Sequence, residues 1–219
     1  MHKTILFLLL MTGLLMAQQS PQYSAGVTLG SSIPTGEFAD KEEGGAAAGT
    51  NFGLKAYYHY TKNISFGVSY DIQVFEYSED FEDDLRKDLP VGAVLELEKW
   101  NFNTLLFSSK YAVPVNEKLN AFGEAYLGFA FCKSPAITAK YNGQKVFSLT
   151  SAKSPAMAFG LGGGVDYAIN SQWSLDFTLG IFPVLEPEYE MKNLDGVTEK
   201  IKQKQAHMKF SLGVLYHFD

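Results

Sequence analysis

The amino-acid sequence predicts an all-β fold, an eight-stranded antiparallel transmembrane β-barrel. Three observations predict it. Apolar and polar residues alternate in eight separate segments, the connections between them alternate between short and long, and the two faces of each segment differ in character. Strict alternation is typical of a strand with one face in an apolar environment. The expected strands are 23–33, 52–60, 64–75, 104–113, 121–132, 156–169, 173–182 and 207–218.

The connections favour a membrane barrel over a compact soluble domain. Short segments (61–63, 114–120 and 170–172) follow the second, fourth and sixth strands, whereas long polar segments follow the other strands. Long loops of this kind are uncommon in compact soluble domains. Transmembrane barrels place short turns at one rim and long loops at the other, so we expect short periplasmic turns and long extracellular loops.

One face of every expected strand is apolar and carries no charge. In the third strand this face holds Ile64, Phe66, Val68, Tyr70, Ile72 and Val74. A Lys or Arg on the lipid face of a barrel costs about 2–4 kcal/mol at the bilayer midplane, so the absence of charge is what lipid contact requires. The apolar face is therefore predicted to point outward.

The opposite face is rich in Gly, Ser and Thr and holds all the charges within the strands. Small residues inside a narrow barrel leave room for a few long ones, and buried charges are tolerable only when they are paired. We therefore predict an interior charge network that fills the lumen rather than lining an open pore. Its members are Lys55, Asp71, Lys110, Glu124, Asp166, Asp176 and Lys209.

Aromatic residues on the apolar face gather near the short-turn ends of the strands. Tyr and Trp are enriched at membrane–water interfaces, and barrels carry aromatic girdles there. The predicted interface girdle consists of Tyr23, Tyr58, Tyr60, Phe66, Tyr111, Tyr167, Trp173, Tyr216 and Phe218.

Two segments complicate the strand count. Residues 137–149 contain an Asn142-Gly143 pair, a strong hairpin signal, but the arms are too short to span a bilayer. Residues 91–102 lead into the fourth strand with an irregular pattern across Asn101 and Asn103, which indicates a bulge or the membrane boundary. Ten strands stay an alternative. Together with residues 71–78, these segments are candidates for a sheet rising above the membrane.

The N-terminus has the layout of a secretory signal peptide: Lys3, an apolar run, then Ala17. The expected domains are a signal peptide, 1–17, and a barrel domain, 18–219. Because Cys132 is the only cysteine, an intramolecular disulfide is excluded. The formal net charge of −6, without a basic run, argues against nucleic-acid binding.

Four segments carry a resemblance to a known family: GVTLGSSIPTGEF (26–38), AYLGFAF (125–131), GLGGGVDYAINSQWSLD (160–176) and the aromatic last strand. The chain resembles the small outer-membrane β-barrel superfamily that contains OmpX, Ail and the OmpA transmembrane domain. It is especially similar to the "outer membrane protein beta-barrel domain" proteins of diderm, Gram-negative bacteria.

This resemblance implies residence in the bacterial outer membrane and export through the signal peptide. It also implies insertion by the barrel-assembly machinery, which reads a last strand ending in Phe. Here Asp219 follows Phe218, a departure from that pattern. Expected partners are outer-membrane lipids, lipopolysaccharide and an extracellular partner at the loops, and the chain is expected to be a monomer.

The function we expect is non-catalytic, either structural or a surface for adhesion or ligand binding, with no cofactor or metal. One alternative is a lipid A-modifying barrel enzyme, for which inward-pointing His207 and loop residues Ser148, Ser151 and Ser154 are the candidates. His59 and His217 lie at the wrong rim for that chemistry. A second alternative is a soluble periplasmic lipocalin-like barrel, with the apolar face inside. The acidic segment 76–88 is expected to be a solvated loop.

Overall fold

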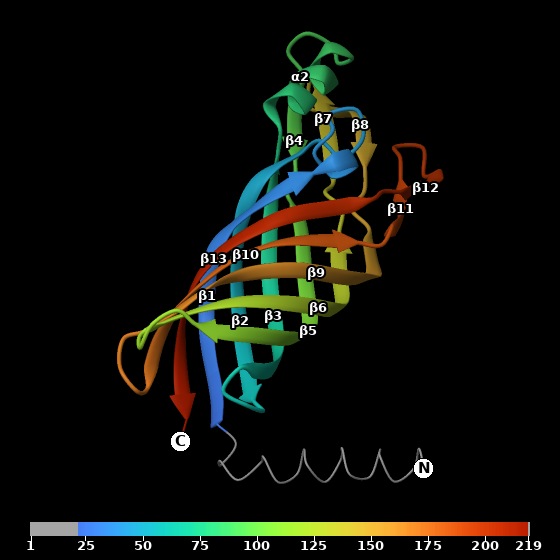
Figure 1. Cartoon of the computed structure of the whole chain (residues 1–219). Helices are drawn as coiled ribbons and strands as arrows, with labels where there is room; N and C mark the ends of the chain where they lie inside the picture. Colours follow the sequence, from blue (N-terminus) through green and yellow to red (C-terminus); the bar gives the residue numbers. More distant parts are fainter. Residues whose placement is uncertain (1–21, 219) are drawn as a thin grey trace, which may run out of the picture.

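The computed structural model describes residues 22–218, and these form one closed antiparallel barrel with an extension at one end (Figure 1). The predicted signal peptide lies outside the described residues. Within residues 22–218, no helix is long and apolar enough to cross a membrane.

Eight strands close the barrel in the order β1-β13-β10-β9-β6-β5-β3-β2. The prediction of eight barrel strands is confirmed, and the ten-strand alternative is wrong. The barrel strands are β1 (Gln22–Thr35), β2 (Ala46–His59), β3 (Ile64–Tyr77), β5 (Trp100–Pro114), β6 (Leu119–Lys133), β9 (Lys153–Ala168), β10 (Trp173–Val184) and β13 (Gln205–Phe218).

The short turns between barrel strands share one local device. In each turn a side-chain oxygen of the second residue accepts hydrogen bonds from backbone N–H groups further along the chain. Thr61 Oγ1 accepts from Ile64 at 2.9 Å, Asn116 Oδ1 from Leu119 at 2.9 Å, and Asn170 Oδ1 from Trp173 at 2.8 Å. Such side chains mimic a backbone turn, which explains why these short segments reverse the chain tightly.

The long connections carry further structure at the opposite end. The extension consists of η1 (Gly36–Phe38), α2 (Glu79–Lys87), β4 (Val94–Leu97), β7 (Ile137–Tyr141), β8 (Gln144–Leu149), β11 (Glu188–Lys192) and β12 (Thr198–Lys202). These strands form a three-stranded sheet, β4-β7-β8, and a two-stranded sheet, β11-β12. Figure 1 shows α2 and the three-stranded sheet beyond the barrel end.

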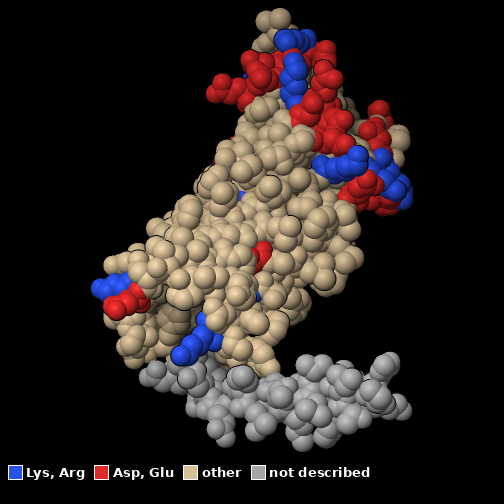
Figure 2. Space-filling model, viewed as in Figure 1, with Lys and Arg blue, Asp and Glu red and all other residues tan. Residues whose placement is uncertain are grey.

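The apolar faces of the strands point outward, as predicted. Leu212 in β13 is 58% exposed and its barrel neighbour Leu29 is 65% exposed, whereas Ser211 and Thr28 are buried. Figure 2 shows a broad area almost free of charged side chains on the visible face of the barrel, with charges gathered mainly at its two ends. The soluble lipocalin-like alternative needs the apolar face inside and is therefore wrong.

One of the two expectations about the start of the fourth strand, the bulge, is wrong. The alternation continues through Asn101 and Asn103, which both face outward between buried Trp100, Phe102 and Thr104. No register shift interrupts the pairing of β5 with β3 or β6, so the pattern does not mark a bulge. It fits the other reading, in which polar residues mark the upper boundary of the lipid-facing band.

Small residues inside the barrel make room for aromatic rings. A Cβ added at Gly67 would come within 2.7 Å of the Tyr57 ring, and one at Gly164 within 2.8 Å of the Phe122 ring. Because these rings belong to neighbouring strands, the glycines are required for the rings to lie flat in the lumen.

The apolar core lies inside the barrel at the long-loop end. We define the mouth cluster as Phe38, Phe75, Trp100, Phe102, Phe182 and Tyr189, all of them buried. Phe38 enters from η1 and stacks on Phe102 with a centroid separation of 5.2 Å. A connection between strands therefore contributes the residue that closes the mouth.

His207 lies fully buried against the mouth cluster. Its ring stacks on Phe182 with centroids 5.7 Å apart and meets Phe75 edge-on at 5.5 Å. Among the described residues, neither ring nitrogen has a hydrogen-bond partner. A buried polar group left unsatisfied costs about 1–3 kcal/mol.

The lipid-facing assignment predicts a depth-dependent cost for charge. Leu212→Arg, at mid-strand, should lower the free energy of unfolding by about 2–4 kcal/mol, and Val113→Arg, near the short-turn rim, by about 0–1 kcal/mol. Denaturant titrations of the refolded protein in phospholipid vesicles, followed by tryptophan fluorescence, measure both. Equal costs at the two positions would contradict the assignment.

The unsatisfied ring of His207 predicts a stabilising substitution. His207→Phe should raise the free energy of unfolding by about 1 kcal/mol, because it removes two unpaired polar atoms and keeps the ring stack. His207→Ala, which removes the ring and leaves a cavity, should lower it. If His207→Phe proves destabilising in the same titration, the ring nitrogens have partners that this packing does not provide.

Candidate functional site

The seven predicted interior charges all point into the lumen, and six of them form ion pairs. Lys55 Nζ lies 2.8 Å from Asp176 Oδ1, and Lys209 Nζ lies 3.0 Å from Asp71 Oδ2. Lys110 Nζ joins two carboxylates, Asp166 at 2.8 Å and Asp176 at 3.5 Å. Lys55, Asp176, Lys110 and Asp166 therefore form one connected chain of charges across the lumen.

Glu124 is held differently from the other carboxylates. It accepts hydrogen bonds from two buried tyrosine hydroxyls, from Tyr57 at 3.0 Å and from Tyr126 at 2.7 Å. The ammonium group of Lys110 lies 3.7 Å from the centroid of the Phe122 ring, in a cation–π contact. The hydrogen bond from Tyr57 in β2 to Glu124 in β6 is charge-assisted, and it joins two strands that share no backbone pairing.

The histidines do not form a catalytic arrangement with the candidate serines. The two rim histidines bond to other serines at the short-turn end: His59 to Ser24 at 2.9 Å and Ser65 at 2.8 Å, and His217 to Ser174 at 2.9 Å. His207 contacts aromatic rings instead. Across residues 22–218, no group of three or more His, Cys, Asp or Glu side chains is placed to hold a metal ion.

The nine aromatic residues of the predicted girdle lie outside the barrel at the short-turn end. Eight of them are exposed and Tyr216 is half-buried. Several contact one another: Tyr23 and Tyr58 at 5.5 Å, and Trp173 and Tyr216 at 4.9 Å between ring centroids. They form a partial belt beneath the apolar band, and their role at a membrane interface stays a prediction.

We define the platform as α2 together with the sheet β4-β7-β8. The predicted hairpin at Asn142-Gly143 is confirmed, because both residues have positive φ, 51° and 79°, between β7 and β8. That conformation matches a two-residue hairpin turn. We expected residues 71–78 to contribute to this sheet, and that expectation is wrong. Residues 71–77 are instead the last part of β3 in the barrel.

The acidic segment expected to be a solvated loop folds into α2. The side chain of Ser78 caps the helix by accepting a hydrogen bond from the Phe81 N–H at 3.2 Å. Acidic residues occupy the first turn, and Arg86 and Lys87 the last, as the helix dipole favours. This capping serine and charge order are the sequence signal that the acidic composition obscured.

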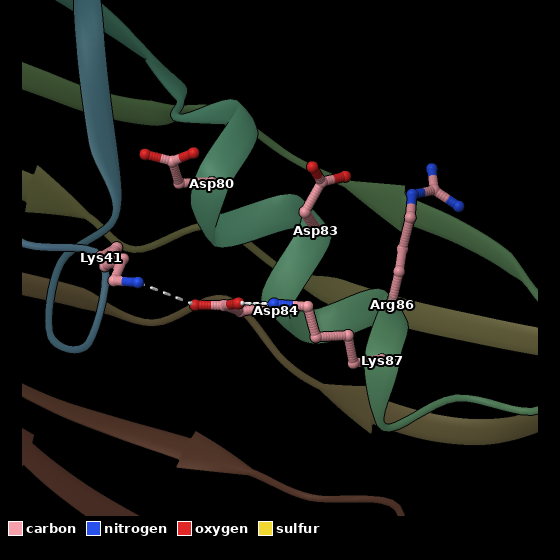
Figure 3. Close-up of a pocket in the computed structure, with 6 residues that line it drawn as sticks. All are labelled: Lys41, Asp80, Asp83, Asp84, Arg86 and Lys87. Atoms are coloured by element: carbon pink, nitrogen blue, oxygen red, sulfur yellow. Dashed lines mark hydrogen bonds and ion pairs between the residues drawn. The ribbon is translucent and has the colours of Figure 1, made fainter.

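Ion pairs tie α2 to the neighbouring loop. Figure 3 shows Asp84 between Lys41, which reaches it from the β1–β2 connection, and Lys87 of the same helix. The hydrogen bond from Lys87 and the charge of Lys41 lower the pKa of Asp84. Asp80 and Asp83 line the same open groove, of about 470 Å³. Among the described residues, no Lys or Arg side chain forms an ion pair with either of them.

Solved structures that match this chain in fold include outer-membrane proteins. A major outer membrane protein of Thermus thermophilus matches with a TM-score of 0.59 and 12% identity, over 91% of this chain and 100% of the other. Ail of Yersinia pestis matches with 0.54 and 14%, over 91% and 100%. The protease OmpT of Escherichia coli matches with 0.54 and 9%, over 93% and 100%. At these identities the likeness shows the fold alone.

No curated protein sequence matches the chain significantly. A sequence profile for the family described as "Outer membrane protein beta-barrel domain" matches residues 5–218, nearly the whole chain. The eight-stranded closed barrel with its apolar outer face is the architecture this description names. The long loops are therefore extracellular, the short turns periplasmic, and the chain belongs to the outer membrane protein beta-barrel domain family of the bacterial outer membrane.

Proposed function

We propose that this chain is a non-catalytic outer-membrane barrel that holds the platform above the membrane as an interaction surface for an extracellular partner. The observation that carries the proposal is the platform itself. Three short strands and a capped helix stand beyond the lipid-facing band, where they add nothing to closing the barrel. Ordered structure on loops positioned by a rigid scaffold is where binding sites are usually found.

The lumen supports a structural role rather than transport or catalysis. Between the short-turn rim and the mouth cluster the lumen holds the ion-paired chain and Tyr57, Phe122 and Tyr126, and its extracellular end holds the mouth cluster. A filled lumen offers neither a water path nor a cavity for substrate. We also propose that the chain acts as a monomer, contacts outer-membrane lipids and lipopolysaccharide, and is inserted by the barrel-assembly machinery.

The fold neighbours supply a precedent for surface roles, with a difference in charge. Ail is described as the attachment invasion locus protein of Yersinia pestis, and a second structure of it contains the heparin analogue sucrose octasulfate. In the present chain, the platform with its connections, residues 79–97 and 137–149, carries seven acidic and four basic residues. That composition disfavours a polyanionic ligand at the platform, so the proposed partner differs from such a ligand in charge.

The interior ion pairs predict coupled effects on stability. Lys55→Met should lower the free energy of unfolding by about 3 kcal/mol, because the buried Asp176 carboxylate keeps only the longer ion pair with Lys110 and the hydrogen bond from Thr178. Lys55→Met combined with Asp176→Leu should cost clearly less than the sum of the single substitutions. Denaturant titrations in vesicles measure all three variants.

Additive losses of stability in this double-mutant cycle would contradict a coupled network.

The wild-type protein from the same preparation should show no steady conductance in planar bilayers, since the lumen is filled. A steady conductance there would overturn the structural role proposed for the lumen.

The interaction role predicts that the platform carries binding. Outer-membrane vesicles displaying the wild-type chain should bind cultured epithelial cells or immobilised matrix proteins more than vesicles without it. Replacing residues 138–148 by a short Gly/Ser connection should abolish that excess, because it removes β7 and β8. Replacing residues 193–197, at the turn between β11 and β12, should leave it unchanged.

Each variant is first checked for the heat-dependent gel mobility of a folded barrel. Binding by the 138–148 variant at the wild-type level would contradict the proposed function, and so would wild-type binding no greater than that of empty vesicles.

A further inference from the structure

A cleft of about 350 Å³ lies on the platform, between α2 with the turn that follows it and the three-stranded sheet. Its volume falls in the range of about 300–1,000 Å³ that is usual for small ligand pockets. Leu85, Asp88, Leu89 and Pro90 form one wall, and Leu95, Ile137, Val146 and Phe147 form the other. Only one of these eight side chains is charged, so the cleft is mainly apolar.

A β-bulge widens the apolar wall of the cleft. Ala139 in β7 pairs with Phe147 in β8, but the next residue, Lys140, pairs with Lys145. Val146 is therefore an extra residue, and it lines the cleft beside Phe147 instead of pointing to the opposite face. Val146 is 39% exposed and Phe147 38% exposed, so both present apolar surface to solvent. Bulges commonly re-aim side chains at functional sites.

The apolar surface continues along the turn from α2 to β4. Val91 is 98% exposed and follows Pro90 of the cleft directly in the sequence. This valine neither closes the barrel nor packs in the mouth cluster. An exposed apolar patch rimmed by polar residues marks an interaction site more often than a passive surface.

Unpaired negative charge lies in the cleft, at Asp88, and on the rest of α2, where Asp80 and Asp83 line the neighbouring groove. The basic residues on and beside α2, namely Lys41, Arg86 and Lys87, are all engaged by Asp84 or Glu82. Within the described part of the chain, no cation lies within ion-pair distance of Glu79, Asp80, Asp83 or Asp88. On the platform sheet, Lys140 is held by Glu96 at 2.6 Å, which leaves Lys145 as the one sheet cation without an acidic partner there.

We propose that the cleft binds a cationic polypeptide segment, which inserts a bulky apolar side chain between α2 and Val146 while flanking Lys or Arg residues meet the acids of α2. This inference rests on the proposed function and names its partner by chemistry. The apolar wall supplies the energy of burial, and the surplus of carboxylates supplies attraction and orientation.

The charge pattern distinguishes this partner from other occupants. Lipopolysaccharide and polyanionic sugars would meet repulsion from the unpaired carboxylates of α2. A second copy of the chain is also negative, with a formal charge of −6, and would bring an acidic platform of its own against the carboxylates of α2. A basic segment with one or two large apolar residues satisfies both features of the cleft.

Fluorescence anisotropy with a labelled synthetic peptide tests the proposal. The probe carries Leu-Phe between two runs of Lys and Arg, and the protein is the refolded full chain in nanodiscs of zwitterionic lipid. Binding should be saturable and should weaken as salt is raised, because screening reduces attraction between exposed charges. Val146→Trp, which fills the cleft, should weaken binding about tenfold, an effect the size of one partly buried apolar side chain.

Matched variants separate the cleft from the rest of the surface. Ile201→Trp is the control for Val146→Trp, because Ile201 is similarly exposed on β12, outside the platform. Asp88→Asn should weaken binding about threefold, whereas Asp195→Asn, in the β11–β12 turn, should not, since only Asp88 lines the cleft. A peptide with Ser-Ser in place of Leu-Phe should bind at least about tenfold more weakly.

Equal binding of the Leu-Phe and Ser-Ser peptides would overturn the inference, and so would unchanged peptide binding by Val146→Trp. Displacement of the labelled peptide by protein-free anionic lipid vesicles would overturn it as well. None of these affects the vesicle adhesion assay. If adhesion still depends on residues 138–148 while the peptide fails, the partner is misidentified and the proposed function stands. If adhesion does not depend on those residues, the proposed function itself fails.

Discussion

Closure of the backbone hydrogen-bond ring between β1 and β13 is the constraint on which the rest of the structure depends. In lipid, an unpaired backbone N–H or C=O costs several kcal/mol, so a sheet can cross a membrane only when it has no edge. The pairing of Tyr23 with Phe218 through to Thr35 with Ala206 supplies that closure. Once the ring is closed, successive side chains of each strand point alternately to the lipid and to the lumen. Every charge in the strands must then be accommodated inside.

The interior is too narrow for charged side chains to stay hydrated, so these side chains form ion pairs with one another. Lys55 and Asp176 meet from β2 and β10, and Lys110 reaches Asp166 from β5 to β9. These contacts cross the lumen, and they tie together strands that share no backbone pairing. The mouth cluster completes the filling with apolar side chains at the extracellular end. A barrel filled in this way fits the supporting role that we propose, in which binding is left to the loops.

The sequence predicts the strands well because the two-residue period is local, and because contact with lipid excludes charged residues from one face of every strand. The Asn142-Gly143 turn is equally local. The partners inside the lumen were not predictable: Lys55 and Asp176 are joined by the ring closure and the stagger of the strands, which no local pattern encodes. Phe38 illustrates the same limit, since a connecting segment folds back to stack on Phe102. The helix α2 was missed for a different reason. Its acidic composition suggested a loop, and the cap at Ser78 outweighs that composition.

The acidity of α2 acquires a physical meaning from its position. Figure 1 places α2 at the end of the molecule farthest from the short-turn rim, and Figure 2 shows its acidic side chains facing solvent. We propose that an outer leaflet rich in anionic lipopolysaccharide repels such a surface, which disfavours folding of the platform onto the membrane. On this proposal the same carboxylates attract cationic partners from solution, and exposed apolar residues such as Val91 face those partners rather than the lipid. One distribution of charge would then both orient the platform and select its partner.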